Sequence, residues 1–307
     1  MSIETIKYDE YEAKIDVDNG ATCISLKNVK YNASLLRECE GEKSTPYLYG
    51  MPILFPANRI ETGVFVFDGR EYKFPVTEER TNCFIHGDLC QRKFNVLSKT
   101  RNTIECSYVA NKNNRYYGFA NEFEIRIEYM LSDNGLSQNT KISNLSPFSM
   151  PVMLGFHTTF NVPFINDSNK DDVLIYADID FEIERNINYL PTGKISKDDF
   201  VKMFQKGEFS TSKNPVSKHC FAKDSGKMVM YDKSKNLSLV YENDEKFKYR
   251  LLYNGDGKEF ICLEPQTNFV NFFKAEKPND ISGFDVILPN ESKVYKSLVS
   301  IKEGDFR

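Results

Sequence analysis

Alternation of apolar and polar residues with a period of two is the feature that most restricts how this chain can fold. In residues 123–131, Phe, Ile, Ile, Tyr and Leu alternate with polar residues, and Asn134-Gly135 follows as a turn signal. Residues 64–74 contain two β-rich runs joined by Asp68-Gly69. Because Asp-Gly and Asn-Gly pairs favour the tight turns that join antiparallel strands, both regions are predicted to be β-hairpins.

Further strands are expected at short intervals through most of the chain, at residues 173–183, 228–231, 237–241, 249–252, 260–263, 286–288 and 294–301. This spacing indicates a β-sandwich or a barrel. Helical periodicity is scarce. The best helix candidate is 196–204, with Ser196 as its cap and Asp199 three residues on. Without alternating strands and helices, doubly wound and TIM-barrel folds are disfavoured.

We therefore expect an all-β fold with few short helices. Strand signals resume directly after the polar stretch 206–218, which we interpret as a loop, so residues 1–307 are predicted to form a single domain.

Composition excludes several classes of function. Lys plus Arg total 40 and Asp plus Glu total 44, giving a net charge of −4, and no long basic run is present to follow a phosphate backbone. We expect no nucleic-acid partner. No stretch approaches the roughly 18 apolar residues that span a bilayer, and the N-terminus does not read as a signal peptide, so we expect no membrane association.

The cysteines favour a reducing compartment. There are seven, an odd number, and no Cys-x-x-Cys pair occurs. This argues against a disulfide framework and against a structural zinc site. We expect a cytoplasmic protein with reduced thiols, no metal and no cofactor.

The chain has only three histidines, and histidine is the side chain best suited to proton transfer near neutral pH. His86 precedes Gly87 in a turn, where a solvent-exposed, idle histidine is the plainer interpretation. His157 follows the apolar run 150–156, where a polar ring must find a hydrogen-bond partner, and the plainer interpretation is a satisfied core histidine. His219 has a charged, loop-like setting and receives no role.

Glu264 is the most suggestive carboxylate. Alternation along 260–264 puts Phe260, Cys262 and Glu264 on one face of a strand, where burial would raise the pKa of Glu264. Pro265 is expected to end that strand. A strand-end glutamate is more often a surface or paired residue, so this signal is weak alone.

Arg59 follows an apolar, turn-rich stretch that ends in Asn58, and its planar fork of donors suits sugar hydroxyls as well as carboxylates. A structural arginine bonding loop carbonyls is the alternative.

Taken together, the segments resemble the aldose 1-epimerase (galactose mutarotase-like) family. The matching pieces occur in the family's order over nearly the whole chain: 49–60 (YGMPILFPANRI), the hairpin around Asp68-Gly69, His86-Gly87, 144–146 (NLS), 150–157 (MPVMLGFH), 191–193 (PTG) and 263–267 (LEPQT).

The resemblance implies a large antiparallel β-sandwich, the galactose mutarotase-like supersandwich, with an open sugar cleft. It implies that Glu264 is the general base, His157 the general acid and His86 a second active-site histidine. It also implies that Arg59 and Asn58 bind sugar hydroxyls. A substrate-binding aspartate of the family has no counterpart: the nearest match to its Asp-His-x-Phe segment is 218–221 (KHCF), which puts a galactose preference in doubt.

The expected reaction is interconversion of the α and β anomers of a hexose. A base removes the proton of the anomeric hydroxyl while an acid protonates the ring oxygen, and the ring opens and recloses. The sequence predicts a site that starts as ionised Glu264 and protonated His157, with Phe or Tyr covering the apolar sugar face. Its partner would be a small-molecule sugar, and the sequence does not indicate an oligomeric state.

Two alternatives share the fold. A mutarotase for a phosphorylated hexose would need cations at the cleft rim, and Lys218 and Lys223 are the candidates. A non-catalytic carbohydrate-binding or sugar-sensing protein would not need an acid–base pair.

Overall fold

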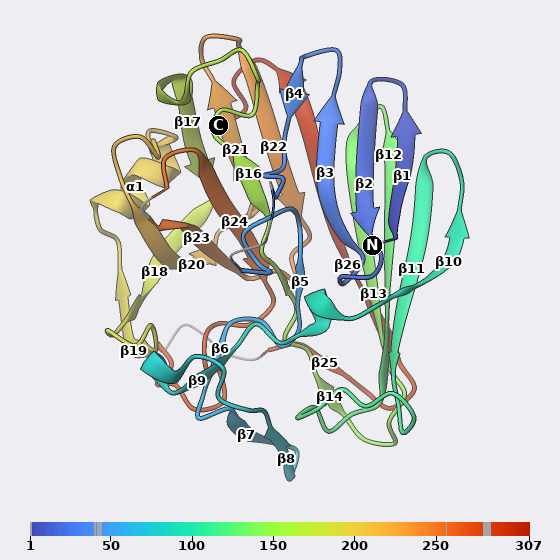
Figure 1. Cartoon of the computed structure of the whole chain (residues 1–307). Coiled ribbons are helices and arrows are strands. Elements are labelled where there is room, and N and C mark those ends of the chain that lie inside the picture. The colour runs from blue at the N-terminus through green and yellow to red at the C-terminus, as the bar shows by residue number, and fades with distance from the viewer. Residues whose placement is uncertain (1, 40, 42–44, 256, 279–283) are drawn as a thin grey trace.

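The computed structural model describes residues 2–39, 41, 45–255, 257–278 and 284–307, and these form a large antiparallel β-sandwich (Figure 1). The predicted all-β, antiparallel fold class is confirmed. Among the described residues, the helical structure amounts to α1 (Asp199–Lys206) and three short 3₁₀ turns: η1 (Glu79–Thr81), η2 (Leu89–Gln91) and η3 (Lys170–Asp172). No helix within these ranges is long and apolar enough to cross a membrane.

One large sheet forms the back of the cleft described below. Its strands are, in spatial order, β19 (Pro191–Ser196), β18 (Ile179–Arg185), β20 (Val216–Ala222), β23 (Tyr249–Gly255), β24 (Phe260–Gln266), β15 (Gly155–Phe156) and β5 (Ile53–Leu54), with β16 (Thr159–Asn161) also pairing with β24.

The other large sheet packs as a second layer (Figure 1). Its strands are, in spatial order, β10 (Asn95–Lys99), β11 (Thr103–Ala110), β12 (Phe123–Ser132), β13 (Gly135–Asn144), β26 (Ser292–Glu303), β22 (Leu237–Asn243), β21 (Met228–Asp232) and β17 (Val173–Ala177).

Smaller sheets complete the fold. They are β1 (Ile3–Tyr8), β2 (Tyr11–Asp16), β3 (Thr22–Asn28) and β4 (Ala33–Ser34) in one sheet, and the pairs β6 (Arg59–Glu61) with β9 (Cys83–Ile85), β7 (Val64–Phe67) with β8 (Arg70–Lys73), and β14 (Met150–Pro151) with β25 (Val286–Ile287).

The two predicted hairpins are present. β7 and β8 pair with Phe67 opposite Arg70, and the turn residues Asp68 and Gly69 have φ angles of 49° and 71°. Positive φ at both turn positions matches the right-handed twist of the flanking strands, which is why Asp-Gly is favoured there. β12 and β13 pair along their whole lengths.

The period-two pattern follows from packing between the layers. The five apolar residues of β12 that alternate along 123–131 are fully buried, whereas those between them are not. Each such side chain contributes roughly 1.5–3 kcal/mol when removed from water. A shift of one residue in register would expose all of them, so the core fixes the pairing.

The predicted strand 173–183 is wrong as a single strand, because the chain changes sheets at Asp178. β17 ends before it and β18 begins after it, in the other layer. The Asp178 carboxylate accepts the N–H groups of Ser225 (2.8 Å) and Gly226 (3.3 Å), which hold the crossing in place.

The predicted helix also begins later than expected. Its cap is Asp198, whose carboxylate accepts the N–H of Val201 at 2.9 Å, rather than Ser196, and Gly207 ends the helix in a left-handed conformation. Ser196 is instead the last residue of β19, where strand pairing uses its backbone.

Candidate active site

The structure brings His157 and Glu264 into direct contact. His157 Nε2 lies 3.2 Å from Glu264 Oε1, and both side chains are buried. The contact follows from strand pairing: Gly155 of β15 lies opposite Gln266 of β24, and Thr159 of β16 lies opposite Cys262. The residue midway between Gly155 and Thr159 therefore faces the residue midway between Cys262 and Gln266.

The sequence predicted that Pro265 ends the strand that carries Glu264. This prediction is wrong, because β24 continues through Pro265 to Gln266. It does interrupt pairing on one side. The N–H groups of Leu263 and Thr267 donate to the neighbouring segment, to Thr158 and Leu154, but proline has no N–H to donate between them. This gap coincides with the break between β15 and β16, where His157 lies.

A hydrogen-bonded chain of amides supports the carboxylate. The Asn58 side chain donates to Gln266 Oε1 at 3.2 Å, and Gln266 Nε2 donates to Glu264 Oε2 at 3.1 Å. The Asn58 backbone N–H donates to His86 Nδ1 at 3.3 Å. Asn58 thus links His86 to the face of β24 that carries Gln266 and Glu264. The sequence predicted only that Asn58 binds sugar hydroxyls. Sequence reasoning missed Gln266, although it shares the alternating face of Cys262 and Glu264.

His86 is not the exposed turn residue of the plainer interpretation, since its side chain is only 7% exposed. Its ring centroid lies 5.4 Å from that of His157 and 4.8 Å from that of Tyr47. The turn is tight: His86 has φ 64°, and a Cβ on Gly87 would lie 2.1 Å from the Phe55 carbonyl oxygen. Only glycine fits at position 87, and this turn aims the imidazole at the His157 ring.

His86, His157 and Asn58 line an open cleft of about 390 Å³. We call this part of the cleft, together with the fully buried Glu264 that His157 contacts, its base. The cleft is also lined by Tyr47, Tyr253 and Leu251. We call the part lined by Arg59, Glu78, Arg80, Arg185, Tyr189 and Ser217 its side. A volume of this size accommodates a monosaccharide. The aromatic residues that line it are tyrosines.

Arg59 forms a bidentate ion pair with Glu78. Arg59 Nε and Nη2 donate to the two carboxylate oxygens at 2.6 and 2.7 Å, and the Thr81 hydroxyl also donates to Glu78. Burial alone would raise the pKa of Glu78, but the hydrogen bonds from Arg59 and Thr81 outweigh it and hold that pKa below its usual value. The structure therefore gives Arg59 a fixed orientation, which the sequence could not predict.

Burial shifts the pKa values of the acid–base residues in the direction that favours the neutral form of each side chain. Desolvation raises the pKa of Glu264 well above its usual value, against the hydrogen bond from Gln266 and the charges of Arg185 and Arg59. Desolvation lowers the pKa of His157 to about 4. It also lowers that of His86 well below its usual value, with further lowering by His157 and Arg59. The pKa shifts of Glu264 and His157 both disfavour the charged starting pair predicted from the sequence and favour a neutral carboxyl on Glu264 beside a neutral imidazole on His157.

The setting predicted for His219 is also wrong. His219 lies within β20 and is fully buried, and neither ring nitrogen has a hydrogen-bond partner in the described part of the chain. Lys218 and Lys223 are not rim cations of this cleft. Lys218 is bound to Glu182 and to Asp198 (2.7 Å), and Lys223 lines a separate hollow formed by 221–226 and 244–250.

One group of potential metal ligands occurs in the described residues. His157, Glu264 and Cys262 have donor atoms within 4.8 Å of one another, and all three are buried. Burial raises the pKa of the Cys262 thiol, which disfavours the thiolate that metals bind. A metal held here would occupy both members of the acid–base pair, so the donor set fits proton transfer better than a resident metal.

The fold and the site together define a β-sandwich protein with a histidine–carboxylate pair at the base of a sugar-sized cleft. Comparison with known proteins agrees. The sequence model described as "Aldose 1-epimerase" matches residues 3–298. The chain belongs to the aldose 1-epimerase family, and the family and fold support a mutarotase-type function.

Similar proteins have closely related folds. A galactose mutarotase-like protein from Clostridium acetobutylicum is 29% identical, with a TM-score of 0.90 over 99% of both chains. A putative aldose 1-epimerase from Escherichia coli is 17% identical, with a TM-score of 0.79 over 98% of this chain and 99% of the other, which shows the fold alone. The uncharacterized protein YihR of Escherichia coli is 22% identical over 257 residues, 81% of this chain and 77% of that protein.

Proposed function

We propose that this protein is an aldose 1-epimerase (mutarotase) that interconverts the α and β anomers of a hexose by acid/base-catalysed ring opening and closure. The observation that carries the proposal is the 3.2 Å contact between His157 Nε2 and Glu264 Oε1 beside a cleft of monosaccharide size. The ring oxygen and the anomeric hydroxyl of a pyranose are bonded to the same carbon. Two proton-transfer groups that act on them must therefore lie close together, as these do.

Glu264 is the proposed base and His157 the proposed acid. The pair shares one proton, and moving it from Glu264 to His157 across their contact gives the ionised carboxylate and the imidazolium that the reaction needs. Both forms hold the same number of protons, so the pair titrates as a unit. Arg185 and Arg59 favour the ionised carboxylate, and the hydroxyls of an entering sugar would add to that effect.

The carboxylate then takes the proton of the anomeric hydroxyl as the imidazolium protonates the ring oxygen. The C–O bond to the ring breaks and leaves the open aldehyde. Rotation about C1–C2 and the reverse transfers close the ring on the other face. Each positioned proton transfer contributes roughly 10²–10⁴ in rate.

The neighbouring side chains fit supporting roles. The neutral imidazole of His86 faces His157 edge to face, so it is proposed as the second active-site histidine that meets the substrate. Arg59, held by Glu78, is proposed to donate to sugar hydroxyls, and Asn58 to position Gln266 and Glu264. The partner is a small-molecule sugar. We propose a cytoplasmic location, where the seven cysteine thiols would stay reduced.

The test is anomer exchange measured by the decay of optical rotation of freshly dissolved α-glucose and α-galactose. The wild-type protein should accelerate the decay, and Glu264→Gln and His157→Gln should each remove most of the acceleration with the fold intact by circular dichroism. Glu259→Gln, at an exposed position directly before β24, is the matched control. Calorimetric binding of a sugar with no acceleration would support the sugar-binding alternative instead.

A further inference from the structure

Three arginines surround one tyrosine at the side of the cleft. The guanidinium carbons of Arg59, Arg80 and Arg185 lie 4.6, 5.3 and 5.7 Å from the ring centroid of Tyr189. All four residues line the cleft that contains His86 and His157. The acid–base chemistry of anomer exchange gives Arg59 and Arg185 an effect on Glu264, but it does not account for a third arginine or for the grouping of all three around one tyrosine.

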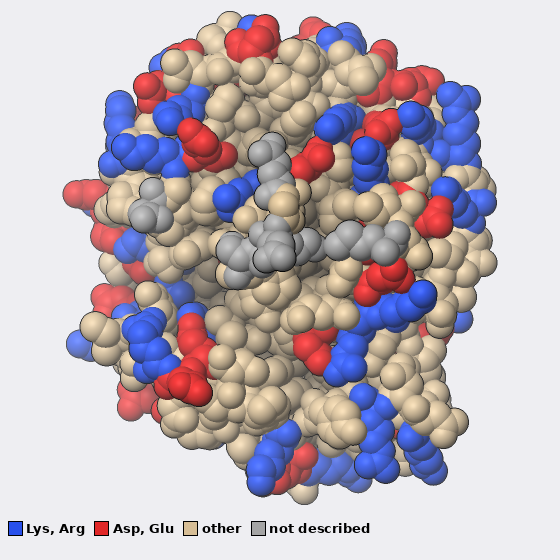
Figure 2. Space-filling model, viewed as in Figure 1, with Lys and Arg blue, Asp and Glu red and all other residues tan. Residues whose placement is uncertain are grey.

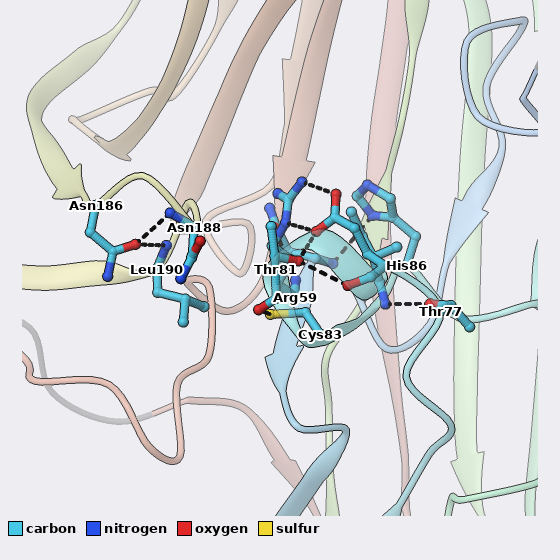
Figure 3. Close-up of polar contacts among 11 residues, drawn as sticks. Arg59, Thr77, Thr81, Cys83, His86, Asn186, Asn188 and Leu190 are labelled. Atoms are coloured by element: carbon cyan, nitrogen blue, oxygen red, sulfur yellow. Dashed lines mark hydrogen bonds and ion pairs between the residues drawn. The ribbon is translucent and has the colours of Figure 1, made fainter.

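Two loops carry the residues of this cluster. Figure 3 shows Asn186, Asn188 and Leu190 of one loop to the left of Arg59, and Thr81 and Cys83 of the other loop next to Arg59. The turn between β18 and β19 is closed by Asn186, whose Oδ1 accepts the N–H groups of Asn188 (2.9 Å) and Leu190 (3.2 Å). This turn places Tyr189 at φ 59°, a conformation rare for an aromatic residue. The other loop carries Glu78, which fixes Arg59, and the adjacent Arg80.

Arg185 has no acidic partner in the described part of the chain. Its Nη2 donates to the backbone oxygen (2.7 Å) and the hydroxyl (3.1 Å) of Ser217, which are neutral, and its buried Nε has no partner among the described residues. The nearby Glu182 is bound to Lys218. A partly buried guanidinium that forms no direct ion pair is stabilised when a ligand supplies the anionic partner.

The balance of charge in the cleft differs from that of the protein. Three arginines face one glutamate, Glu78, among its charged lining residues, whereas the whole chain has a net charge of −4. Figure 2 shows acidic and basic side chains intermixed over this face of the molecule. A local excess of positive charge on an acidic protein focuses anions into that cleft.

We infer that the substrate is an aldose carrying an oxyanion, a phosphate or a carboxylate, on a carbon remote from C1, and that Arg185, Arg80 and Arg59 hold it. This inference rests on the proposed function and names its substrate class. Planar guanidinium groups match the geometry of such oxyanions and bind them bidentately.

The spacing of the sheet fits one sugar between the two groups. Glu264 on β24 lies opposite Leu251 on β23, which lies opposite His219 on β20, the strand that also carries Ser217 on the same face. Two strand spacings, about 10 Å, therefore separate β24 from β20, whose Ser217 accepts the hydrogen bonds of Arg185. A hexose with C1 at Glu264 would direct a substituent on C6 toward Arg185.

The test compares the kcat/KM for anomer exchange, measured by exchange NMR, for glucose, glucose 6-phosphate and glucuronate. We expect at least one of the two anionic sugars to exceed glucose by about tenfold or more at low ionic strength, with the preference falling as salt screens it. The better anionic sugar then identifies the oxyanion. Arg185→Gln should reduce the ratio of anionic to neutral sugar by about tenfold, and the exposed Arg80→Gln by about threefold.

The matched control is Arg126→Gln, which removes an arginine paired with Glu124 on the other sheet and should leave the ratio unchanged. A wild-type preference for glucose over both anionic sugars, or a ratio that neither cleft variant changes, would overturn the inference while leaving the mutarotase proposal intact. If no sugar is accelerated, the proposed function fails. Calorimetry with glucose 6-phosphate then decides the inference alone, by whether Arg185→Gln weakens binding.

Discussion

The base and the side of the cleft use opposite electrostatics. At the base, Glu264, His157 and His86 are buried, and desolvation moves each toward its neutral form. At the side, the guanidinium groups of Arg59, Arg80 and Arg185 lie close to one tyrosine, and Arg59 pairs with Glu78. The difference separates two tasks: a low-dielectric base suits proton transfer, whereas a charged side suits substrate capture.

The largest expected effect on the rate comes from removing the proton acceptor at the base of the cleft. We expect Glu264→Gln to lower kcat for anomer exchange by roughly 10²–10⁴ while changing KM little, because the amide keeps the shape of the side chain but cannot accept the proton. Steady-state polarimetry checks this. A similar fall from Arg80→Gln would show that the two regions are not separate.

The pH dependence of the rate tests whether burial keeps the side chains at the base of the cleft in their neutral forms. A second proton on the pair removes its proton acceptor, and the pKa of His157 is lowered to about 4. The acid limb of kcat/KM for a neutral sugar should therefore have its midpoint near pH 4, with activity recovered on return to pH 7. An acid limb near pH 6.5 would mean that His157 titrates as it does in water, against the account.

Glu78→Gln tests the charged side. It loosens Arg59, so we expect KM for glucose to rise about tenfold with kcat little changed, in keeping with the loss of a charge-assisted bidentate contact. Removing a negative charge also makes the cleft more positive, so KM for glucose 6-phosphate should rise less than KM for glucose. Equal changes for both sugars would argue that Glu78 is only structural.

The smallest effect concerns stability. Burial lowers the pKa of His219 well below 6.5, so its contribution is present above pH 6.5 and is lost as pH falls below that value, because the unfolded chain gains a proton that the folded chain does not. His219→Leu should reduce the loss of stability between pH 7 and 5 by up to about 1.4 kcal/mol per pH unit. Chemical denaturation at both pH values measures it. A variant with the wild-type pH dependence would show that His219 does not contribute.

Much of the fold could be predicted from local pattern, because alternation and turn residues act over a few positions. The hairpins at Asp68-Gly69 and in 123–144 follow from such signals. The crossing at Asp178 could not be predicted, since it depends on N–H groups nearly fifty residues away. The one-domain interpretation of residues 1–307 stays a prediction.

The candidate site divides in the same way. Resemblance to a family picked out Glu264, His157, His86, Arg59 and Asn58. The structure places the last four in the lining of one cleft and Glu264 in contact with His157, and their roles stay proposals. Arg185, Tyr189 and Gln266 were missed, because their importance comes from tertiary neighbours. No local sequence signal distinguishes Arg185 from a surface arginine, whereas Gln266 could have been found two residues after Glu264 on the same strand face.

The most direct test of the account is a crystal structure of the protein with a bound aldose. The account predicts that C1 lies at the base, with the anomeric hydroxyl and the ring oxygen within hydrogen-bond distance of Glu264 and His157, and with the exocyclic carbon directed to Arg185. A sugar bound in the cleft with C1 turned away from that pair, toward the arginines or the solvent, would contradict it.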